Sequence, residues 1–291
     1  MLEDKAHFRQ GRLHPAIVGE ITVSNPDLSL CRTLLFLPAS NARAIEKARS
    51  LPADMIILDL EDAVREEDKA TARDQAVAAV QQGFGGRLAA IRINAVGNPH
   101  HGSDMLAARR SHVPYVILPK AETPRQISDT KAICERPVIA MVETPAAVLG
   151  VGELAAVCAG LIVGTNDLSA DLGIPPGAGR SGLVLALQRV LLAARAVRIP
   201  AFDGVYNQLD DEVGLAEEAE QGRRYGFDGK SVIHPSQVDT VNRIFSPSDA
   251  ELAAAAALVE AAIGGAQRHE GRMIEEMHVI QARRLLARAR S

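Results

Sequence analysis

The chain has 291 residues, which is one large domain or two average ones when the length is divided by about 150. Its composition, 47% hydrophobic and 23% charged, is that of a folded globular protein and excludes a disordered chain. A formal net charge of −4 and an aromatic content of 3% argue against nucleic-acid binding. With no long apolar run and no signal-peptide core in residues 1–7, we expect a cytoplasmic protein that does not bind membranes.

Eight short aliphatic runs recur along the chain, and their starts lie roughly 22 to 40 residues apart. This spacing is too wide for β-hairpins and leaves room for a helix between successive strands. The runs are apolar on consecutive residues, which is typical of parallel strands buried on both faces. The expected strands cover residues 33–37, 55–60, 88–94, 115–118, 137–143, 161–164, 201–205 and 230–233.

Helices are expected between these strands, over residues 42–49, 65–81, 124–132, 144–157, 181–196 and 211–224. The alternation runs on without a linker or a shift in composition. It predicts an α/β fold with a single (β/α)8 TIM barrel over residues 31–246. An open doubly wound sheet is the alternative, but the turn after its first strand would carry a glycine-rich phosphate motif, which residues 37–41 lack.

Two segments lie outside the expected barrel. Residues 1–30 form a polar N-terminal extension, and residues 247–291 contain two further helices, over 250–263 and 275–288. Because a closed barrel needs no further cover, we expect these C-terminal helices to pack on a neighbouring subunit or to cap the barrel mouth.

Polar side chains follow almost every expected strand. In a TIM barrel the active site lies at the carboxyl ends of the strands, so these side chains should meet at one rim. Each of them alone could be a helix cap, a turn residue or a solvated charge, but the whole set predicts an active site. The residues are Ser40, Arg43, Glu61, Asp62, Arg92, Asn94, Lys120, Glu143, Asp167, Asp203 and His234.

Glu143 and Asp167 form the sharpest candidate site. Glu143 ends an otherwise apolar strand, and Asp167 follows the next strand along the chain. Two carboxylates on neighbouring strand ends repel each other, and a hard divalent cation resolves that repulsion. Oxygen ligands favour Mg²⁺, and the absence of nearby His or Cys disfavours Zn²⁺. The alternative is that Asp167 only caps the following helix and that Glu143 only stands at a helix start.

Arg92 alternates with apolar neighbours in its strand, so it should point into the barrel mouth and needs an anionic partner there. That partner is either a substrate carboxylate or an internal carboxylate, Glu61 or Glu143. The sequence does not rank Asp59, Glu61 and Asp62 as metal ligand, orienting group or acid/base. Lys120 is not a clear Schiff-base lysine, because such a lysine needs burial to lower its pKa.

Eight motifs in this order resemble the citrate lyase β-subunit-like (CitE-like) group of the HpcH/HpaI aldolase superfamily, from residue 32 to the C-terminus. They are RTLLFLP at 32–38, DLEDAV at 59–64, RIN at 92–94, LPK at 118–120, VETP at 142–145, GTNDLSADLG at 164–173, GFDGK at 226–230 and IHP at 233–235.

The resemblance implies a Mg²⁺-dependent TIM-barrel lyase that cleaves or forms a carbon–carbon bond in a 3-hydroxyacyl-CoA. Substrates would be of the malyl-, citramalyl- or citryl-CoA type, and the products an acyl-CoA and a 2-oxo acid. It further implies a homotrimer or homohexamer. A CoA-independent class II aldolase for hydroxy-oxo acids and a non-catalytic subunit stay open as alternatives.

The resemblance also assigns roles to residues. Glu143 and Asp167 would hold the metal, with Glu143 also near substrate, and Arg92 would bind substrate and stabilise charge. Asp62, beside Glu61, falls where relatives place an acid/base. The remaining substrate-binding positions are Phe36, Arg43, Lys47, Ile233 and His234.

One position departs from the pattern. Some relatives carry an aspartate near the C-terminus that reaches a neighbouring subunit's site, and here the corresponding residue is Glu275. A carboxylate is kept, but it is one methylene longer. Glu275 is therefore a candidate general base.

Overall fold

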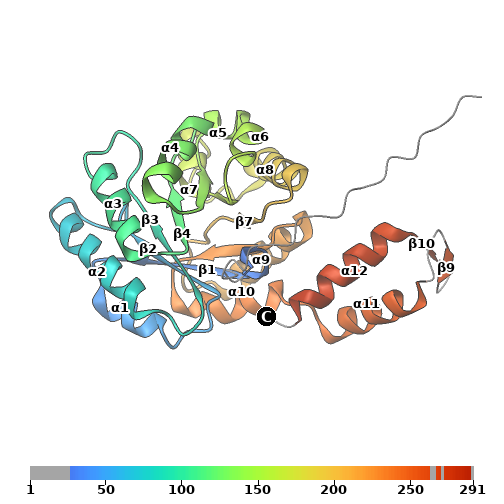
Figure 1. Cartoon of the computed structure of the whole chain (residues 1–291). Helices are drawn as coiled ribbons and strands as arrows, with labels where there is room; N and C mark the ends of the chain where they lie inside the picture. The colour runs from blue at the N-terminus through green and yellow to red at the C-terminus, as the bar shows by residue number, and fades with distance from the viewer. Residues whose placement is uncertain (1–26, 263–266, 270–271, 290–291) are drawn as a thin grey trace, which may run out of the picture.

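Eight parallel strands follow one another around a closed barrel in a computed structural model that describes residues 27–262, 267–269 and 272–289 (Figure 1). The predicted TIM barrel is confirmed, and each strand lies within two residues of its expected position. The strands are β1 (Thr33–Pro38), β2 (Met55–Asp59), β3 (Leu88–Arg92), β4 (Tyr115–Leu118), β5 (Val138–Val142), β6 (Gly160–Val163), β7 (Ala201–Asp203) and β8 (Gly229–Val232).

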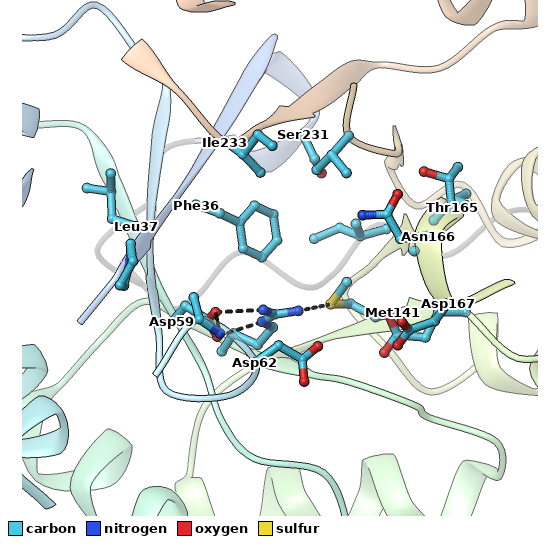
Figure 2. A pocket seen from close by; sticks show the side chains of 18 residues that line it. Phe36, Leu37, Asp59, Asp62, Met141, Thr165, Asn166, Asp167, Ser231 and Ile233 are labelled. Carbon is cyan, nitrogen blue, oxygen red and sulfur yellow. Dashed lines mark hydrogen bonds and ion pairs between the residues drawn. The ribbon is translucent and has the colours of Figure 1, made fainter. Parts of the chain in front are cut away.

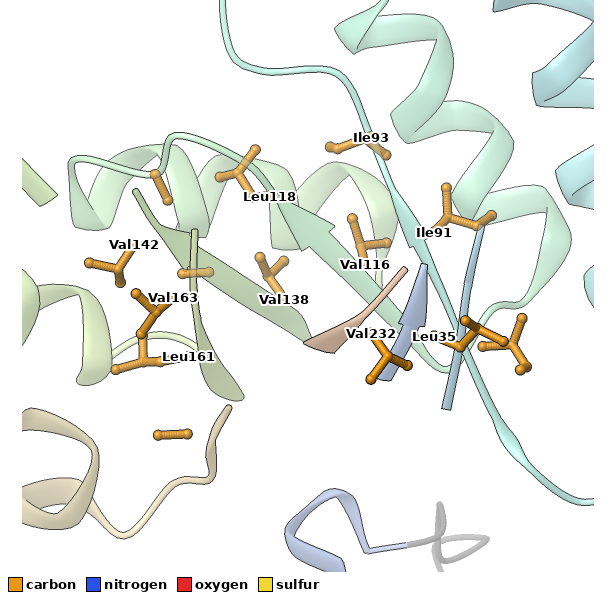
Figure 3. Close-up of a cluster of buried hydrophobic side chains, with 14 of the residues drawn as sticks. Leu35, Ile91, Ile93, Val116, Leu118, Val138, Val142, Leu161, Val163 and Val232 are labelled. Atoms are coloured by element: carbon orange, nitrogen blue, oxygen red, sulfur yellow. The ribbon is translucent and has the colours of Figure 1, made fainter. Parts of the chain in front are cut away.

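Alternate side chains of each strand point to opposite sides of the barrel wall. In β1, Leu34 joins the cluster that fills the barrel interior, whereas Leu35 joins the larger cluster between strands and helices. Figure 3 shows this outer cluster, with Leu118, Val142 and Val163 among its members. Burial on both faces explains why the strands are apolar on consecutive residues.

Helices cover the outside of the barrel (Figure 1). The helix expected over 144–157 is broken at Gly150 into α5 and α6, and α3, α7 and α10 were not expected. The helices around the barrel are α1 (Ala42–Ala48), α2 (Lys69–Gln82), α3 (His101–Ser111), α4 (Pro124–Cys134), α5 (Pro145–Leu149), α6 (Val151–Ala155), α7 (Thr165–Asp171), α8 (Val184–Val197), α9 (Glu212–Tyr225) and α10 (Val238–Phe245).

Short 3-10 turns precede or link several of these elements. They are η1 (Leu28–Leu30), η2 (Glu66–Asp68), η3 (Ser181–Leu183) and η4 (Pro235–Gln237). Except for residues 27–30, the expected N-terminal extension lies outside the described residues. In the part of the chain that the structure describes, no helix is both long and apolar enough to cross a membrane.

The C-terminal helices project from the barrel as a two-helix arm, α11 (Asp249–Ala261) and α12 (Glu276–Arg288) (Figure 1). Two short antiparallel strands, β9 (Gln267–His269) and β10 (Arg272–Ile274), lie at the far end of the arm. The arm contacts the barrel at its base, where Arg223 pairs with Glu251 at 2.6 Å. Most of the arm therefore has no cover from its own barrel.

Candidate active site

A cavity of about 390 Å³ opens at the carboxyl ends of the strands, where the sequence predicted the active site (Figure 2). Seven of the eight strands, all except β4, contribute to it directly or through the loops after them, which explains why its residues are so far apart in sequence. The predicted residues that line it are Phe36, Asp62, Arg92, Glu143, Asp167 and Ile233.

Glu143 and Asp167 are brought together by the pairing of β5 with β6. Val142 and Val163 lie opposite each other in register, so the two loops leave the barrel side by side. Glu143 is 3% exposed, whereas the side chain of Asp167 is 38% exposed. The pair thus joins a buried carboxylate to one that solvent can reach, which suits a cation that enters from the cavity.

Neither carboxylate caps a helix. Thr144 is the N-cap of α5, where its hydroxyl accepts the N–H of Ala147. Gly164 is the N-cap of α7, and no side chain caps that helix. The structure thus removes the cap explanation for Asp167 and gives the helix start at Glu143 to Thr144, which leaves both carboxylates available to a ligand.

Two backbone features hold Glu143 in place. The Lys120 N–H donates to Glu143 Oε1 at 2.7 Å. Gly164 makes room on the other side, since a Cβ at that position would lie 2.3 Å from Glu143 Oε2. Burial raises the pKa of Glu143 to about 6, although the Lys120 amide opposes the rise. The carboxylate is therefore fixed and poorly solvated, and a cation would stabilise its charge.

Arg92 lies across the cavity, and its charge is already paired with internal carboxylates. It donates to both oxygens of Asp59 at 2.7 and 2.6 Å and lies 3.1 Å from Glu61 Oε2. Its guanidinium stacks over the Phe36 ring at 5.2 Å and contacts the Met141 sulfur. The partners are Asp59 and Glu61 rather than Glu143, which fixes a planar cation at the cavity wall.

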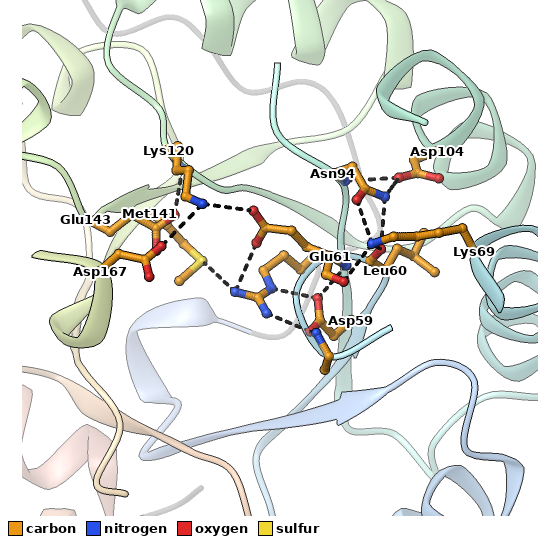
Figure 4. A network of polar contacts seen from close by, with 12 residues as sticks. Asp59, Leu60, Glu61, Lys69, Asn94, Asp104, Lys120, Met141, Glu143 and Asp167 are labelled. Carbon is orange, nitrogen blue, oxygen red and sulfur yellow. Dashed lines mark hydrogen bonds and ion pairs between the residues drawn. The ribbon is translucent and has the colours of Figure 1, made fainter. Parts of the chain in front are cut away.

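Glu61 and Asp62 take different positions despite being adjacent in sequence. Asp62 is exposed and lines the cavity, whereas Glu61 is 6% exposed and lies behind it, between Arg92 and Lys120 (Figure 4). Burial raises the pKa of Glu61 to about 8 in spite of the opposing attraction of Arg92. The loop therefore presents one accessible carboxylate and one buried carboxyl whose protonated form is favoured by its surroundings.

Lys120 reaches across the mouth between two carboxylates, with its Nζ 3.4 Å from Asp167 Oδ2 and 3.9 Å from Glu61 Oε1 (Figure 4). Partial burial would lower the pKa of Lys120, but Glu61 and Asp167 raise it. The ammonium form is therefore favoured. This agrees with the prediction that the chemistry does not use a Schiff base.

Two of the predicted rim residues, Asp203 and Asn94, are buried in polar networks outside the cavity lining. Asp203 is fully buried, pairs in register with Lys230 and accepts two hydrogen bonds from Arg180, so it belongs to a structural ion network. Asn94 was expected at the same rim as Arg92, but it is buried against Asp104 and Lys69, because β3 ends at Arg92 and the strand alternation stops there. The expectation of one shared rim is wrong for these two residues.

Five other predicted residues lie outside the cavity lining, and one of them is Ser40, which is partly buried in the turn after β1. Arg43 and Lys47 are exposed on α1, and His234 is exposed beside Ile233, with its Nδ1 against the Ser236 hydroxyl. Glu275 is exposed on the arm, where its N–H donates to His278 Nδ1 at 2.9 Å. Their roles stay predictions.

Three residues of the site were not found from the sequence. Gly164 and Met141 support Glu143 and Arg92 as described. Ser231 lines the cavity, and its buried hydroxyl has no hydrogen-bond partner within the described residues. The signal for Ser231 was the strand alternation in β8, since Ser231 must face the opposite way from its neighbour Lys230.

Among the described residues, no three His, Cys, Asp or Glu side chains gather as a metal cluster. A two-carboxylate site agrees with the predicted chemistry, since Mg²⁺ is commonly held by one or two carboxylates, with water and substrate oxygens completing its shell. The donors present, Glu143 and Asp167, are both hard oxygen ligands and fit this ion.

Fold and site together define a TIM-barrel enzyme with two adjacent carboxylates at its mouth. A family model described as HpcH/HpaI aldolase/citrate lyase matches residues 32–235, and a second, C-C bond lyase of the TIM-barrel fold, matches residues 187–291. The chain belongs to the HpcH/HpaI aldolase/citrate lyase family, as its motifs predicted.

Relatives with assigned names match almost the whole chain. It is 38% identical to a (3S)-malyl-CoA thioesterase of Cereibacter sphaeroides over 89% of this chain and 94% of the relative. It is 31% identical to citrate lyase subunit beta of Escherichia coli over 89% and 93%. The crystal structure of protein CitE from Mycobacterium tuberculosis with magnesium, acetoacetate and coenzyme A matches with a TM-score of 0.78, at 33% identity over 91% of this chain and 100% of that chain.

Proposed function

We propose that this protein is a Mg²⁺-dependent lyase that cleaves the carbon–carbon bond of a malyl-, citramalyl- or citryl-CoA type thioester. The products are an acyl-CoA and a 2-oxo acid. One observation carries the proposal: two carboxylates from adjacent strands, Glu143 and Asp167, flank a cavity whose opposite wall is the fixed cation Arg92. The Mg²⁺ and coenzyme A bound to the tuberculosis CitE protein support the same chemistry.

Glu143 and Asp167 would hold the metal. When bound, Mg²⁺ supplies Lewis-acid polarisation to the hydroxyl and carboxylate oxygens of the substrate. Asp62, which lines the cavity, takes the hydroxyl proton. The electron pair of the breaking bond then passes to the acyl-CoA enolate, which is reprotonated on carbon. Arg92 places positive charge beside the oxygens on which negative charge develops, and losing such a contact commonly costs 10²–10³ in rate.

The thioester would enter along β1 and α1. Phe36 and Ile233 line the cavity, while Arg43 and Lys47 lie one helical turn apart on the exposed surface of α1. Two cations at this spacing suit the phosphates of CoA, with the acyl end reaching inward past Phe36. His234, exposed next to Ile233, lies at the same entrance.

A second candidate reaction is hydrolysis of the thioester bond, which the 38% identity to a malyl-CoA thioesterase favours. The two reactions give different products. Cleavage releases a 2-oxo acid and keeps the thioester, whereas hydrolysis releases a free CoA thiol and no oxo acid.

A panel of CoA thioesters tests the proposal. Oxo acid is measured as its hydrazone, free thiol with a thiol reagent, and each reaction is run with Mg²⁺ and with EDTA. We expect EDTA-sensitive oxo-acid release. Thiol release without oxo acid would identify the thioesterase, and cleavage of free hydroxy-oxo acids alone would identify the CoA-independent aldolase. No turnover of any substrate would favour the non-catalytic subunit.

We also propose a cytoplasmic homo-oligomer, a trimer or hexamer. The arm lacks cover from its own barrel and exposes Met273, Met277 and Ile280, which a second subunit would bury. Glu275 lies on this arm, so it could complete only a neighbour's site. Three free cysteines, two of them buried, suit a reducing compartment. Light scattering on the purified protein measures the oligomer, and a monomer would contradict the proposal.

A further inference from the structure

Lys120 contacts both candidate metal ligands, Glu143 through its backbone and Asp167 through its side chain. Its backbone adopts the left-handed conformation, with φ of 49°, which is unfavourable for a residue with a Cβ. In that conformation its N–H donates to Glu143 Oε1 at 2.7 Å. The backbone therefore fixes where the side chain begins, and the Nζ lies 3.4 Å from Asp167 Oδ2.

The ammonium and a bound cation would compete for Asp167. A divalent ion held by Glu143 and Asp167 would lie next to the Lys120 Nζ, and like charges a few ångströms apart repel strongly in a poorly solvated site. The side chain of Lys120 is 43% exposed and flexible, so it can move. A second carboxylate is close enough to accept the ammonium, since Glu61 Oε1 lies 3.9 Å from the Lys120 Nζ, on the side away from Asp167.

We propose that Lys120 responds to the metal: its ammonium neutralises Asp167 while the site lacks a cation and shifts to Glu61 when a divalent cation binds. The proposal rests on the metal site of the proposed function. The shift would link metal occupancy to Glu61, which lies 3.1 Å from the substrate-binding Arg92 (Figure 4). Lys120 is thus a positioning residue that acts through Glu61 and Asp167.

Direct binding of Mn²⁺, followed by the paramagnetic resonance signal of the free ion, tests this inference. In K120M we expect the Kd for Mn²⁺ to fall about fivefold or more, because one ion pair and one repulsive charge are removed. K120R, which keeps the charge, should bind as the wild type does. K131M is the matched control, since Lys131 is exposed on α4 and the net charge changes equally.

A second pair of variants tests the transfer to Glu61. Measured at pH 8.5, above the pKa of Glu61, E61Q should weaken Mn²⁺ binding, because Lys120 loses its charged alternative partner. The loss should be much smaller when K120M is also present. Additive effects of the two changes, or a K120M protein that binds Mn²⁺ no better than wild type, would overturn the inference.

D167N separates this result from the proposed function. D167N should lose most of the Mn²⁺ affinity. If D167N binds Mn²⁺ as tightly as wild type, the metal site itself is wrong and the inference falls with it. If D167N is defective but K120M is unchanged, only the role of Lys120 is overturned.

Discussion

Replacing Gly164 by alanine perturbs the candidate metal site without adding or removing a charged group. A Cβ at this position would lie 2.3 Å from Oε2 and 2.4 Å from Cβ of Glu143. To restore ordinary van der Waals separation, Glu143 must retreat by about 1 Å. Its carboxylate is also held by the Lys120 N–H on the other side, so it cannot retreat and keep that hydrogen bond.

The expected effect falls on the metal more than on the fold. Displacing a supporting group of a metal ligand typically costs 10- to 100-fold in metal affinity or activity, and we expect a loss of that size for G164A. Overpacking should also lower the free energy of unfolding by about 1–3 kcal/mol, which leaves the protein folded at 25 °C. The backbone at Gly164 has φ of −89°, so alanine adds no backbone strain.

Mn²⁺ binding and thermal denaturation, measured on the same samples, separate the two effects. G102A is the matched control, because a Cβ at Gly102 in α3 would meet nothing within 4 Å. G102A should bind Mn²⁺ as wild type does. A G164A protein with wild-type Mn²⁺ affinity and turnover would refute the reasoning that Glu143 is held in position for a cation.

Three further predictions follow from the site. R92K should lower kcat by about 10²-fold while Mn²⁺ still binds, because lysine cannot bind Asp59 through two parallel hydrogen bonds; unchanged kcat would contradict this. Burial raises the pKa of Glu61 to about 8, whereas a glutamate in the unfolded chain has a pKa of about 4.3. The contribution of Glu61 to the free energy of unfolding of the metal-free wild type is therefore lost as pH rises from about 4.3 to 8. The Tm of E61Q minus the Tm of wild type should increase over that range, and a constant difference would contradict this. E275Q and E143Q should each be inactive alone yet partly active when co-expressed, because a mixed oligomer contains one site with both carboxylates; no recovery in a mixed oligomer would count against Glu275.

The barrel was predictable because its signal is strong and repeated. Eight strand-length runs that are apolar on both faces, each separated from the next by room for a helix, fit few other folds. The misses have local causes. Helix α3 begins with His101 and Gly102 and carries only a weak apolar pattern, so its place is fixed by tertiary contacts such as that of Asp104 with Arg73. Gly150 interrupts the pattern between α5 and α6, where a continuous helix was expected.

The candidate site was predictable only as far as strand ends identify a rim. The sequence does not give the register between strands, so it could not show that Asp59 lies directly opposite Arg92 and becomes its main partner. The sequence also does not show whether a single polar side chain points into the barrel or out toward the helices. Asp203 was expected at the rim, yet its side chain points out of the barrel toward the surrounding helices. There it forms a buried ion pair with Lys230.

The most direct measurement is a crystal structure of the protein grown with MnCl₂, with data collected at a wavelength where manganese scatters anomalously. A single strong anomalous peak should lie at the carboxyl ends of β5 and β6. It should be about 2.1 Å from one carboxylate oxygen of Glu143 and from one of Asp167. A peak elsewhere, or none at a saturating metal concentration, would contradict the claim that these two residues form the metal site.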